Sequence, residues 1–274
     1  MKDKIDTGFK FKEFCSLDDS PIADYLIKSM DIMLSLASIQ QIKKESINLL
    51  NLKPGQKVLE AGCGLSNEVE LMAGMVGEEG RVIAIDTSHR MLEIAKSRVK
   101  STNIIFQNMP VEAIEYPDNF FSACHADRLL VSHQNYDEIF VEMLRVLKPG
   151  GNISITDVDA STLVITPYTS TTKIVIDQIL SSFVNPTMGR KLLNIFSLHN
   201  LHDIKIRVNL STIEDFKTLE KIFDFHAILK SCVKEGKLSE QDVNFWYDLM
   251  EMASQKKRFL YCITFFTVSG IKSD

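Results

Sequence analysis

The sequence has no paired cysteines, no long apolar run and no excess of positive charge. Its five cysteines are scattered without a C-x-x-C spacing, which argues against a structural zinc site and is typical of a reducing compartment. The longest apolar stretch near the C-terminus, Phe259 to Val268, is too short for a membrane span. A formal net charge of -5 at pH 7 gives no bulk attraction to nucleic acid, so we expect no nucleic-acid partner.

The sequence also shows no secretory signal pattern and no segment of biased composition. The charged N-terminus has no apolar run behind it, so it is not a secretory signal and we expect a cytoplasmic protein. Hydrophobic residues make up 45% and charged residues 24% of the 274 residues, which excludes disordered and collagen-like chains. There is no internal repeat and no clean linker, so residues 1–274 are interpreted as a single domain with a sizeable core.

Hydrophobic periodicity predicts helices in the first fifty residues and then strands that alternate with helices. The expected strands are Lys57–Ala61, Arg81–Asp86, Asn103–Gln107, Phe121–Ala126, Asn152–Val158, Asp203–Leu210 and Arg258–Gly270. Alternating strands and helices form right-handed βαβ units, so the fold class is α/β: a Rossmann-like, mostly parallel seven-stranded sheet with helices on both faces.

The remaining segments are interpreted as coverings of this sheet. Residues 1–50 are expected to form a helical lid and residues 51–158 a cofactor-binding core. Residues 159–200 and 211–257 are expected to be helical lid or substrate insertions, the second with two helices broken near Gly236, before a final strand at 258–270. Ligands of such sheets bind beyond the carboxyl ends of the strands, so the residues that follow each strand are the informative ones.

The strongest chemical signal is the glycine turn after the first core strand, with an acid at the end of the next. In Val58–Gly64 the turn reads Gly62-Cys63-Gly64, and Asp86 closes the second strand. Glycine lets the backbone approach a ligand closely, and the helix that follows points free N–H groups at it. A carboxylate such as Asp86 can accept both hydroxyl hydrogens of a ribose. The pattern indicates a nucleoside-containing cofactor.

Two residues distinguish between such cofactors. A dinucleotide fingerprint needs a third glycine where Asn67 stands. Glu60 lies directly before the turn, where a carboxylate repels a pyrophosphate but suits an ammonium or sulfonium charge. S-adenosylmethionine has ribose hydroxyls, both positive groups and no phosphate, so the charge pattern favours it over NAD.

The chain at this point resembles a class I S-adenosylmethionine-dependent methyltransferase, and it is most similar to the small-molecule branch with ubiquinone/menaquinone-type and natural-product methyltransferases. The resemblance covers most of the chain and is densest from Leu52 to Asp159. Besides the glycine turn, it is carried by Leu52–Gly55, Asp86–Ser88 with Met91-Leu92, Tyr116–Phe121, Asp127–His133, Glu142–Gly151, Asp157–Asp159 and Gly189–Leu192.

The resemblance implies roles for individual residues. Glu60, Gly62, Cys63 and Gly64 would line the methionine half of S-adenosylmethionine, Asp86 would hold the ribose, and Asp127 would lie near the amino group or the reacting methyl. The adenine would be contacted by Thr87, Met91, Met109, Pro110 and Val111. The family usually has an acid where Met109-Pro110-Val111 stands, so adenine contacts would fall to the backbone and Asn108.

Catalytic and metal roles stay more open. His133 lies close to the carboxyl edge and is either a general base or an anchor of its loop. Cys63 is interpreted as a small residue that fills the turn rather than a reactive thiol. His125 is expected inside its strand with a structural role. Asp157 and Asp159 face the same side of a strand without other ligands in view, so we predict no metal site.

The leading hypothesis is a methyltransferase that acts on a small, partly apolar organic acceptor, with a homodimer left open as its assembly. The insertions favour a closed pocket over an open face for a macromolecule. The alternative hypothesis is a catalytically silent protein that keeps the cofactor pocket for regulation or assembly. An NAD-dependent oxidoreductase is disfavoured by Asn67 and Glu60. The acceptor and the atom that is methylated are left open.

Overall fold

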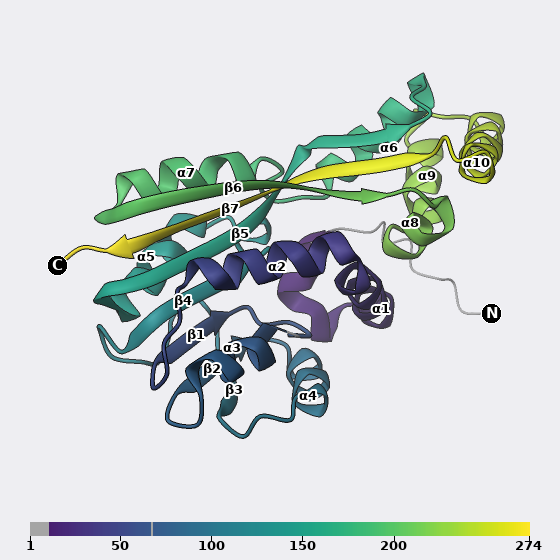
Figure 1. Ribbon diagram of the computed structural model, residues 1–274. Helices are drawn as coiled ribbons and strands as arrows, with labels where there is room; N and C mark the ends of the chain where they lie inside the picture. Colours follow the sequence, from purple (N-terminus) through teal and green to yellow (C-terminus); the bar gives the residue numbers. More distant parts are fainter. Residues whose placement is uncertain (1–10, 67) are drawn as a thin grey trace.

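The computed structural model describes residues 11–66 and 68–274 and contains one seven-stranded sheet with the strand order β3-β2-β1-β4-β5-β7-β6 (Figure 1). The expected fold class is confirmed. The strands are β1 (Lys57–Ala61), β2 (Arg81–Asp86), β3 (Ile104–Asn108), β4 (Phe121–Asp127), β5 (Leu147–Thr166), β6 (Leu201–Ile213) and β7 (Leu260–Lys272).

The first five strands run parallel, whereas β7 is antiparallel to both of its neighbours, β5 and β6. Parallel strands are covered on both faces and therefore consist of nearly continuous apolar residues. In β1 every residue from Val58 to Ala61 is buried, and this run includes Glu60. The carboxyl ends of β1, β2 and β4 consequently meet at one edge of the sheet, where the glycine turn and Asp86 lie.

The helices form layers on the two sides of the sheet. The described residues begin with η1 (Phe11–Asp19), α1 (Ala23–Ser35) and α2 (Ala37–Leu49), and α2 packs against β5, β6 and β7. The other helices are α3 (Glu68–Val76), α4 (His89–Arg98), η2 (Leu130–Ser132), α5 (Tyr136–Val146), α6 (Ser170–Ser181), α7 (Met188–Leu198), α8 (Phe216–Ile222), α9 (Phe225–Lys234) and α10 (Glu240–Gln255). Ser88 caps α4, because its hydroxyl accepts a hydrogen bond from the Met91 amide.

The second half of the chain differs from the expectation in two places. Residues 159–166, assigned to an insertion, continue β5, which stays paired with β7 as far as Thr166. Helix α7, also assigned to a lid, instead packs against β5 and β7 as part of the sheet's own covering layer. Gly189 permits this close packing, since a Cβ there would lie 2.8 Å from the Phe266 ring. Sequence periodicity identifies an amphipathic helix but not the surface it covers.

The region 211–257 contains three helices where two were expected. The chain breaks at Phe223, and Asp224 then caps α9 by accepting a hydrogen bond from the Ala227 amide. The break near Gly236 is present between α9 and α10. Figure 1 shows α6 and α8–α10 gathered beyond the far ends of β5, β7 and β6.

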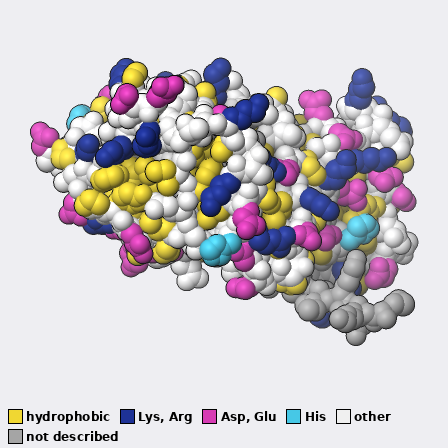
Figure 2. All heavy atoms as spheres, turned by 90° about the horizontal axis from the view of Figure 1, so that it is seen from below, with side chains coloured by type: hydrophobic (Ala, Val, Ile, Leu, Met, Phe, Trp, Pro, Cys, Tyr) yellow, Lys and Arg dark blue, Asp and Glu magenta, His cyan; other side chains and the backbone are white. Residues whose placement is uncertain are grey.

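Within the described ranges, no helix combines the length and apolar character needed to cross a membrane. The same residues contain no group of three or more His, Cys, Asp or Glu side chains placed to hold a metal ion. Figure 2 shows one face of the molecule, on which basic and acidic side chains are interspersed rather than separated by sign.

Candidate functional site

A cavity of about 300 Å³ lies at the carboxyl edge of the sheet, under the N-terminal helices. Its walls come from α1 and α2, from the ends of β1, β2 and β4, and from parts of β6, β7 and α8. Eight of the residues predicted from the sequence to form a site line it: Gly62, Gly64, Asp86, Thr87, Met91, Val111, Asp127 and His133. The topology therefore brings together residues that are more than 70 positions apart in the sequence.

The glycine turn has a geometry that requires glycine. Gly62 and Gly64 have φ angles of 67° and 50°, in the left-handed region that side chains disfavour. A Cβ at Gly62 would also lie 2.7 Å from Leu129 Cδ1, so the Leu129 side chain would have to move to admit it. The Gly64 amide donates a hydrogen bond of 2.8 Å to the Asp86 carboxylate, which ties the turn to the end of β2.

Asp86 is the carboxylate best placed for ribose hydroxyls. One oxygen accepts from the Gly64 amide, and the other accepts from the Ser88 amide at 2.9 Å. Burial raises the pKa of Asp86, and these hydrogen bonds only partly oppose that effect. Each carboxylate oxygen has a second lone pair, so both can also accept a hydroxyl hydrogen from a ligand in the cavity.

Helix η1 is attached to this edge by Asp18, which the sequence analysis did not identify. The Asp18 carboxylate accepts hydrogen bonds from the Ser88 hydroxyl and, at 2.8 Å, from the His89 amide. These bonds hold the pKa of Asp18 below its ordinary value, although burial opposes them. The contact lies at the N-terminus of α4, where the helix dipole favours a negative charge. Helix η1 thereby contributes Phe14 to the cavity wall.

Glu60 does not line the main cavity. Its carboxylate accepts a hydrogen bond of 2.6 Å from His125 Nδ1, and His125 Nε2 lies 2.8 Å from the Ser46 hydroxyl of α2. Because side chains alternate across a strand, Glu60 faces α2 rather than the tip of β1. It does line a second cavity of about 30 Å³ beside the glycine turn, next to Cys63. His125 lies inside β4 with both ring nitrogens bonded, in agreement with its expected structural role.

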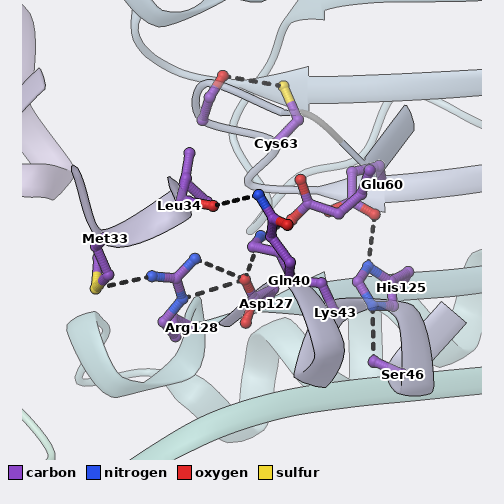
Figure 3. Close-up of polar contacts among 12 residues, drawn as sticks. Met33, Leu34, Gln40, Lys43, Ser46, Glu60, Cys63, His125, Asp127 and Arg128 are labelled. Carbon is purple, nitrogen blue, oxygen red and sulfur yellow. Dashed lines mark hydrogen bonds and ion pairs between the residues drawn. The ribbon is translucent and has the colours of Figure 1, made fainter. Parts of the chain in front are cut away.

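A buried cluster of charged side chains forms the rest of the small cavity (Figure 3). Lys43 of α2 pairs with Asp127 at 2.6 Å and also with Glu68 of α3. Arg128 binds the same Asp127 oxygen with two nitrogens, at 2.7 and 3.1 Å, and a third nitrogen donates to the Met33 sulfur. The cluster thus joins the N-terminal helices to the end of β4.

The charged groups of this cluster stabilise one another's charged forms. Burial would raise the pKa of Asp127, but the adjacent Arg128 and Lys43 hold it well below its usual range. Burial lowers the pKa of Lys43, and the attraction of Asp127 opposes that change. Asp127 is therefore a carboxylate at neutral pH, in contact with both cavities.

The small cavity also contains polar atoms without partners. Ser66 Oγ and Glu68 Oε2 are buried and form no hydrogen bond within the described part of the chain. Buried polar atoms are normally satisfied, so an unpaired hydroxyl and an unpaired carboxylate oxygen in the wall of one cavity fit a polar ligand. The amino and carboxylate groups of the methionine end of S-adenosylmethionine have this character. Lys43, Arg128 and Ser66 could hold the carboxylate, and Glu68 and Asp127 the ammonium.

Other predicted contact residues lie outside the main cavity. Met109 is buried, and its sulfur accepts from the Glu115 amide, whereas Pro110 is exposed. The Asn108 side-chain amide donates to the Asp86 and Thr87 carbonyls, so its hydrogens are already used. Burial raises the pKa of the Cys63 thiol well above its ordinary value, as expected for a residue that fills the turn.

His133 also lines the main cavity, and its contact with a backbone carbonyl defines its neutral tautomer. Its Nδ1 is 2.9 Å from the Leu129 carbonyl oxygen, which can only accept, so Nδ1 carries the hydrogen. The lone pair of a neutral ring is then on Nε2, which lies 3.8 Å from Glu112 Oε1. Glu112, which also lines the cavity, was not identified from the sequence because nothing in its surroundings marks it.

Much of the wall of the main cavity is apolar. Its wall includes residues from α1, α2, β7 and the segments around α6 and α8. Representative side chains are Met33, Ile39, Phe183, Phe223, Ile263 and Phe265. The cavity therefore joins a polar end suited to a nucleoside with a wall suited to an apolar molecule.

Asp157, next to the cavity residue Val158, is fully buried. Its carboxyl accepts hydrogen bonds from the Val131 and Val158 amides, both at 3.0 Å. Burial raises the pKa of Asp157 to about 8, so the native protein keeps it protonated at neutral pH.

We expect Asp157 to make the protein less stable as the pH rises. Its native pKa of about 8 lies above the ordinary value near 4, so the folded state binds the extra proton between these limits. Its stabilisation is fully present below about pH 4 and is lost at roughly 1.4 kcal/mol per pH unit up to about pH 8. Denaturant unfolding at several pH values gives the free energy of unfolding of the wild type and of Asp157→Asn. If this free energy changes with pH by the same slope in both proteins, the prediction is wrong.

Comparison with known proteins gives a consistent assignment. Residues 58–151 match the profile of a family described as a methyltransferase domain. The chain is also 32% identical over 142 residues to the demethylmenaquinone methyltransferase of Bacillus mycoides (strain KBAB4), a match that covers 49% of this chain and 59% of the relative. It therefore spans less than two thirds of that enzyme's length.

Two solved structures share the fold at low sequence identity. A Haemonchus contortus phosphoethanolamine N-methyltransferase 2, in complex with phosphomonomethylethanolamine and S-adenosylhomocysteine, is 16% identical with a TM-score of 0.59, over 95% of this chain and 60% of that one. The [4+2]-cyclase SpnF is also 16% identical, with a TM-score of 0.51, over 86% of this chain and 82% of that one. Likeness at this level shows the fold alone.

Proposed function

We propose that this protein, which contains a class I methyltransferase domain, transfers a methyl group from S-adenosylmethionine to a small, largely apolar organic acceptor. The observation that carries the proposal is that the glycine turn, Asp86 and an apolar wall line the same cavity. The likeness to demethylmenaquinone methyltransferase, whose name indicates a quinone acceptor, supports the same class of acceptor.

Different residues of the chain bind the nucleoside, the amino-acid end of S-adenosylmethionine and the acceptor. S-adenosylmethionine supplies a methyl group on a positively charged sulfur, which leaves as a neutral thioether in an in-line displacement. Asp86 and the glycine turn hold the nucleoside, and the charged cluster around Lys43 holds the amino-acid end. The apolar wall positions the acceptor and excludes water, and positioning alone supplies a large part of the acceleration of such a reaction.

We assign His133 as the general base for an acceptor hydroxyl or carbon acid. Its hydrogen bond to the Leu129 carbonyl leaves the lone pair on Nε2, which takes the acceptor's proton. The Glu112 carboxylate at 3.8 Å then stabilises the imidazolium that forms.

Replacing His133 by asparagine is expected to lower kcat about a hundredfold and to leave the affinity for S-adenosylmethionine unchanged. The asparagine amide can still donate to the Leu129 carbonyl, so the loop is retained while the base is lost. His199→Asn is the matched control, because His199 makes the same bond to the Ile195 carbonyl at 2.8 Å but lies at the end of α7, outside the cavity. Unaltered kcat in His133→Asn would assign this histidine to the loop only.

The overall proposal is tested by titration calorimetry with S-adenosylmethionine and by turnover of methyl-labelled cofactor with lipophilic cell extracts. Binding together with label in an apolar product supports it. Binding without any turnover would favour a silent regulatory protein, and binding of NADH instead would favour an oxidoreductase. The buried free thiols of Cys63, Cys124 and Cys232 support a reducing, cytoplasmic location, which we include in the proposal.

A further inference from the structure

The outer edge of β6 presents an apolar stripe. Strand β6 is last in the sheet order, and its outer edge pairs with no strand of the described residues. Ile206, Val208 and Leu210 are 37%, 54% and 59% exposed. They lie on the same face, because alternate residues of a strand share a face. Figure 1 shows this long strand at the margin of the sheet, alongside α7. An apolar, unpaired edge is a template for another strand.

We propose that β6 pairs with β6 of a second copy of the chain, antiparallel and about a two-fold axis at Val208. This inference is independent of the methyl-transfer proposal. In such a pair Val208 lies opposite Val208 of the second copy, and Ile206 lies opposite Leu210. The three exposed side chains then cover one another, and the two sheets become one continuous sheet of fourteen strands, seven from each copy.

Charge complementarity on the other face supports the same register. Arg207 is exposed, and in this pairing it lies opposite Asn209 of the second copy. The Asn209 side chain donates a hydrogen bond of 3.0 Å to Glu45 of α2, so a carboxylate lies directly beside that position. Arg207 of each copy therefore meets Glu45 of the other, and the two-fold axis produces two such ion pairs.

Neighbouring registers are less favourable. A pair centred on Arg207 places two guanidinium groups opposite each other, and like charges directly opposite destabilise a strand pair. A pair centred on Asn209 places Ile206 opposite Thr212, which leaves part of the apolar stripe without an apolar partner. The register at Val208 satisfies the apolar face and the charged face together.

The first test is the mass of the protein in solution, measured by sedimentation or light scattering at roughly 100 µM, where an interface with a micromolar Kd is occupied. We expect a dimer for the wild type. The substitution Val208→Asp places two carboxylates opposite each other across the two-fold axis. It should raise the dimer Kd at least about tenfold. Val141→Asp is the matched control, since Val141 of α5 is 50% exposed and lies outside β6, and it should stay dimeric.

The second test is a charge exchange between Arg207 and Glu45. Arg207→Glu and Glu45→Arg should each weaken the dimer, whereas the double variant should regain it because the pairs are restored with opposite sign. Any one of three results would overturn the proposal. The wild type could be a monomer at the stated concentration, Val208→Asp could leave the dimer Kd unchanged, or the double variant could dimerise no more tightly than the single variants. Thermal melts of the variants show whether a loss of dimer reflects a loss of fold.

Discussion

Replacing Asp86 by alanine is expected to lower the affinity for S-adenosylmethionine by about a thousandfold and to leave no measurable turnover. The carboxylate is the group placed to accept both ribose hydroxyls, and each hydrogen bond to a charged group contributes about 1.5–3 kcal/mol. Two such bonds correspond to a loss of roughly 10²- to 10⁴-fold in affinity. Titration calorimetry measures the change directly.

The fold should survive this substitution. Burial already raises the pKa of Asp86, so its charge is not a source of native stability. Asp86→Asn keeps an acceptor for the Gly64 amide and should bind the cofactor nearly as poorly as the alanine variant. Asp203→Asn is a control on β6, because Asp203 is exposed and pairs only with the nearby Lys205. If Asp86→Ala binds within about threefold of the wild type, the ribose role is excluded.

Replacing Lys43 by methionine is expected to destabilise the protein by about 3–5 kcal/mol. Methionine has nearly the same length, but it leaves the buried carboxylate of Glu68 without its cation, while Arg128 still pairs with Asp127. An unpaired buried charge costs more than the pair itself contributes. At about 2–4 °C per kcal/mol, the melting temperature should fall by roughly 6–20 °C.

Two variants distinguish the loss of this ion pair from a general effect on α2. Lys44→Met changes the exposed neighbour and should leave the melting temperature almost unchanged. Adding Glu68→Gln to Lys43→Met removes the uncompensated charge and should recover part of the loss. A melting temperature within about 2 °C of the wild type for Lys43→Met would show that Glu68 is satisfied in another way.

Lys43 and Asp18 connect the N-terminal helices to the core. Lys43 pairs with Asp127, and Asp18 binds the first turn of α4 beside Asp86. Residues 11–50 are therefore attached to this edge of the sheet by charged side chains as well as by apolar packing. If these residues act as a lid, opening it must break such pairs.

The parallel core could be predicted because its signals are local. Strand β2 has the expected bounds, Ser88 caps α4, and the glycine turn follows β1 where its sequence indicates. Strand length was less predictable: β5 continues beyond Val158 only because β7 remains beside it as far as Thr166. A strand that depends on a distant partner leaves no clear mark in its own sequence.

The candidate site was predicted in part. Asp86 and the glycine turn follow a recognisable pattern, and both line the cavity. Glu60 was assigned to the methionine half of the cofactor from the same pattern. It lines the small cavity rather than the main one, with one carboxylate oxygen bonded to His125. Lys43 of α2 lines the small cavity, and Glu112, in a loop, lines the main cavity. The sequence around these two residues does not indicate either position.

The order of apolar and polar residues along the chain was sufficient to determine the α/β class, the glycine turn and the acid that closes β2, since each depends on residues only a few positions apart. The tertiary structure alone decided which charges meet. Lys43, Glu68 and Asp127 come from three separate elements, and only the packing of α2 against the sheet brings them within contact. Contacts between distant segments depend on the whole fold, and so does the chemistry of the groups that form them.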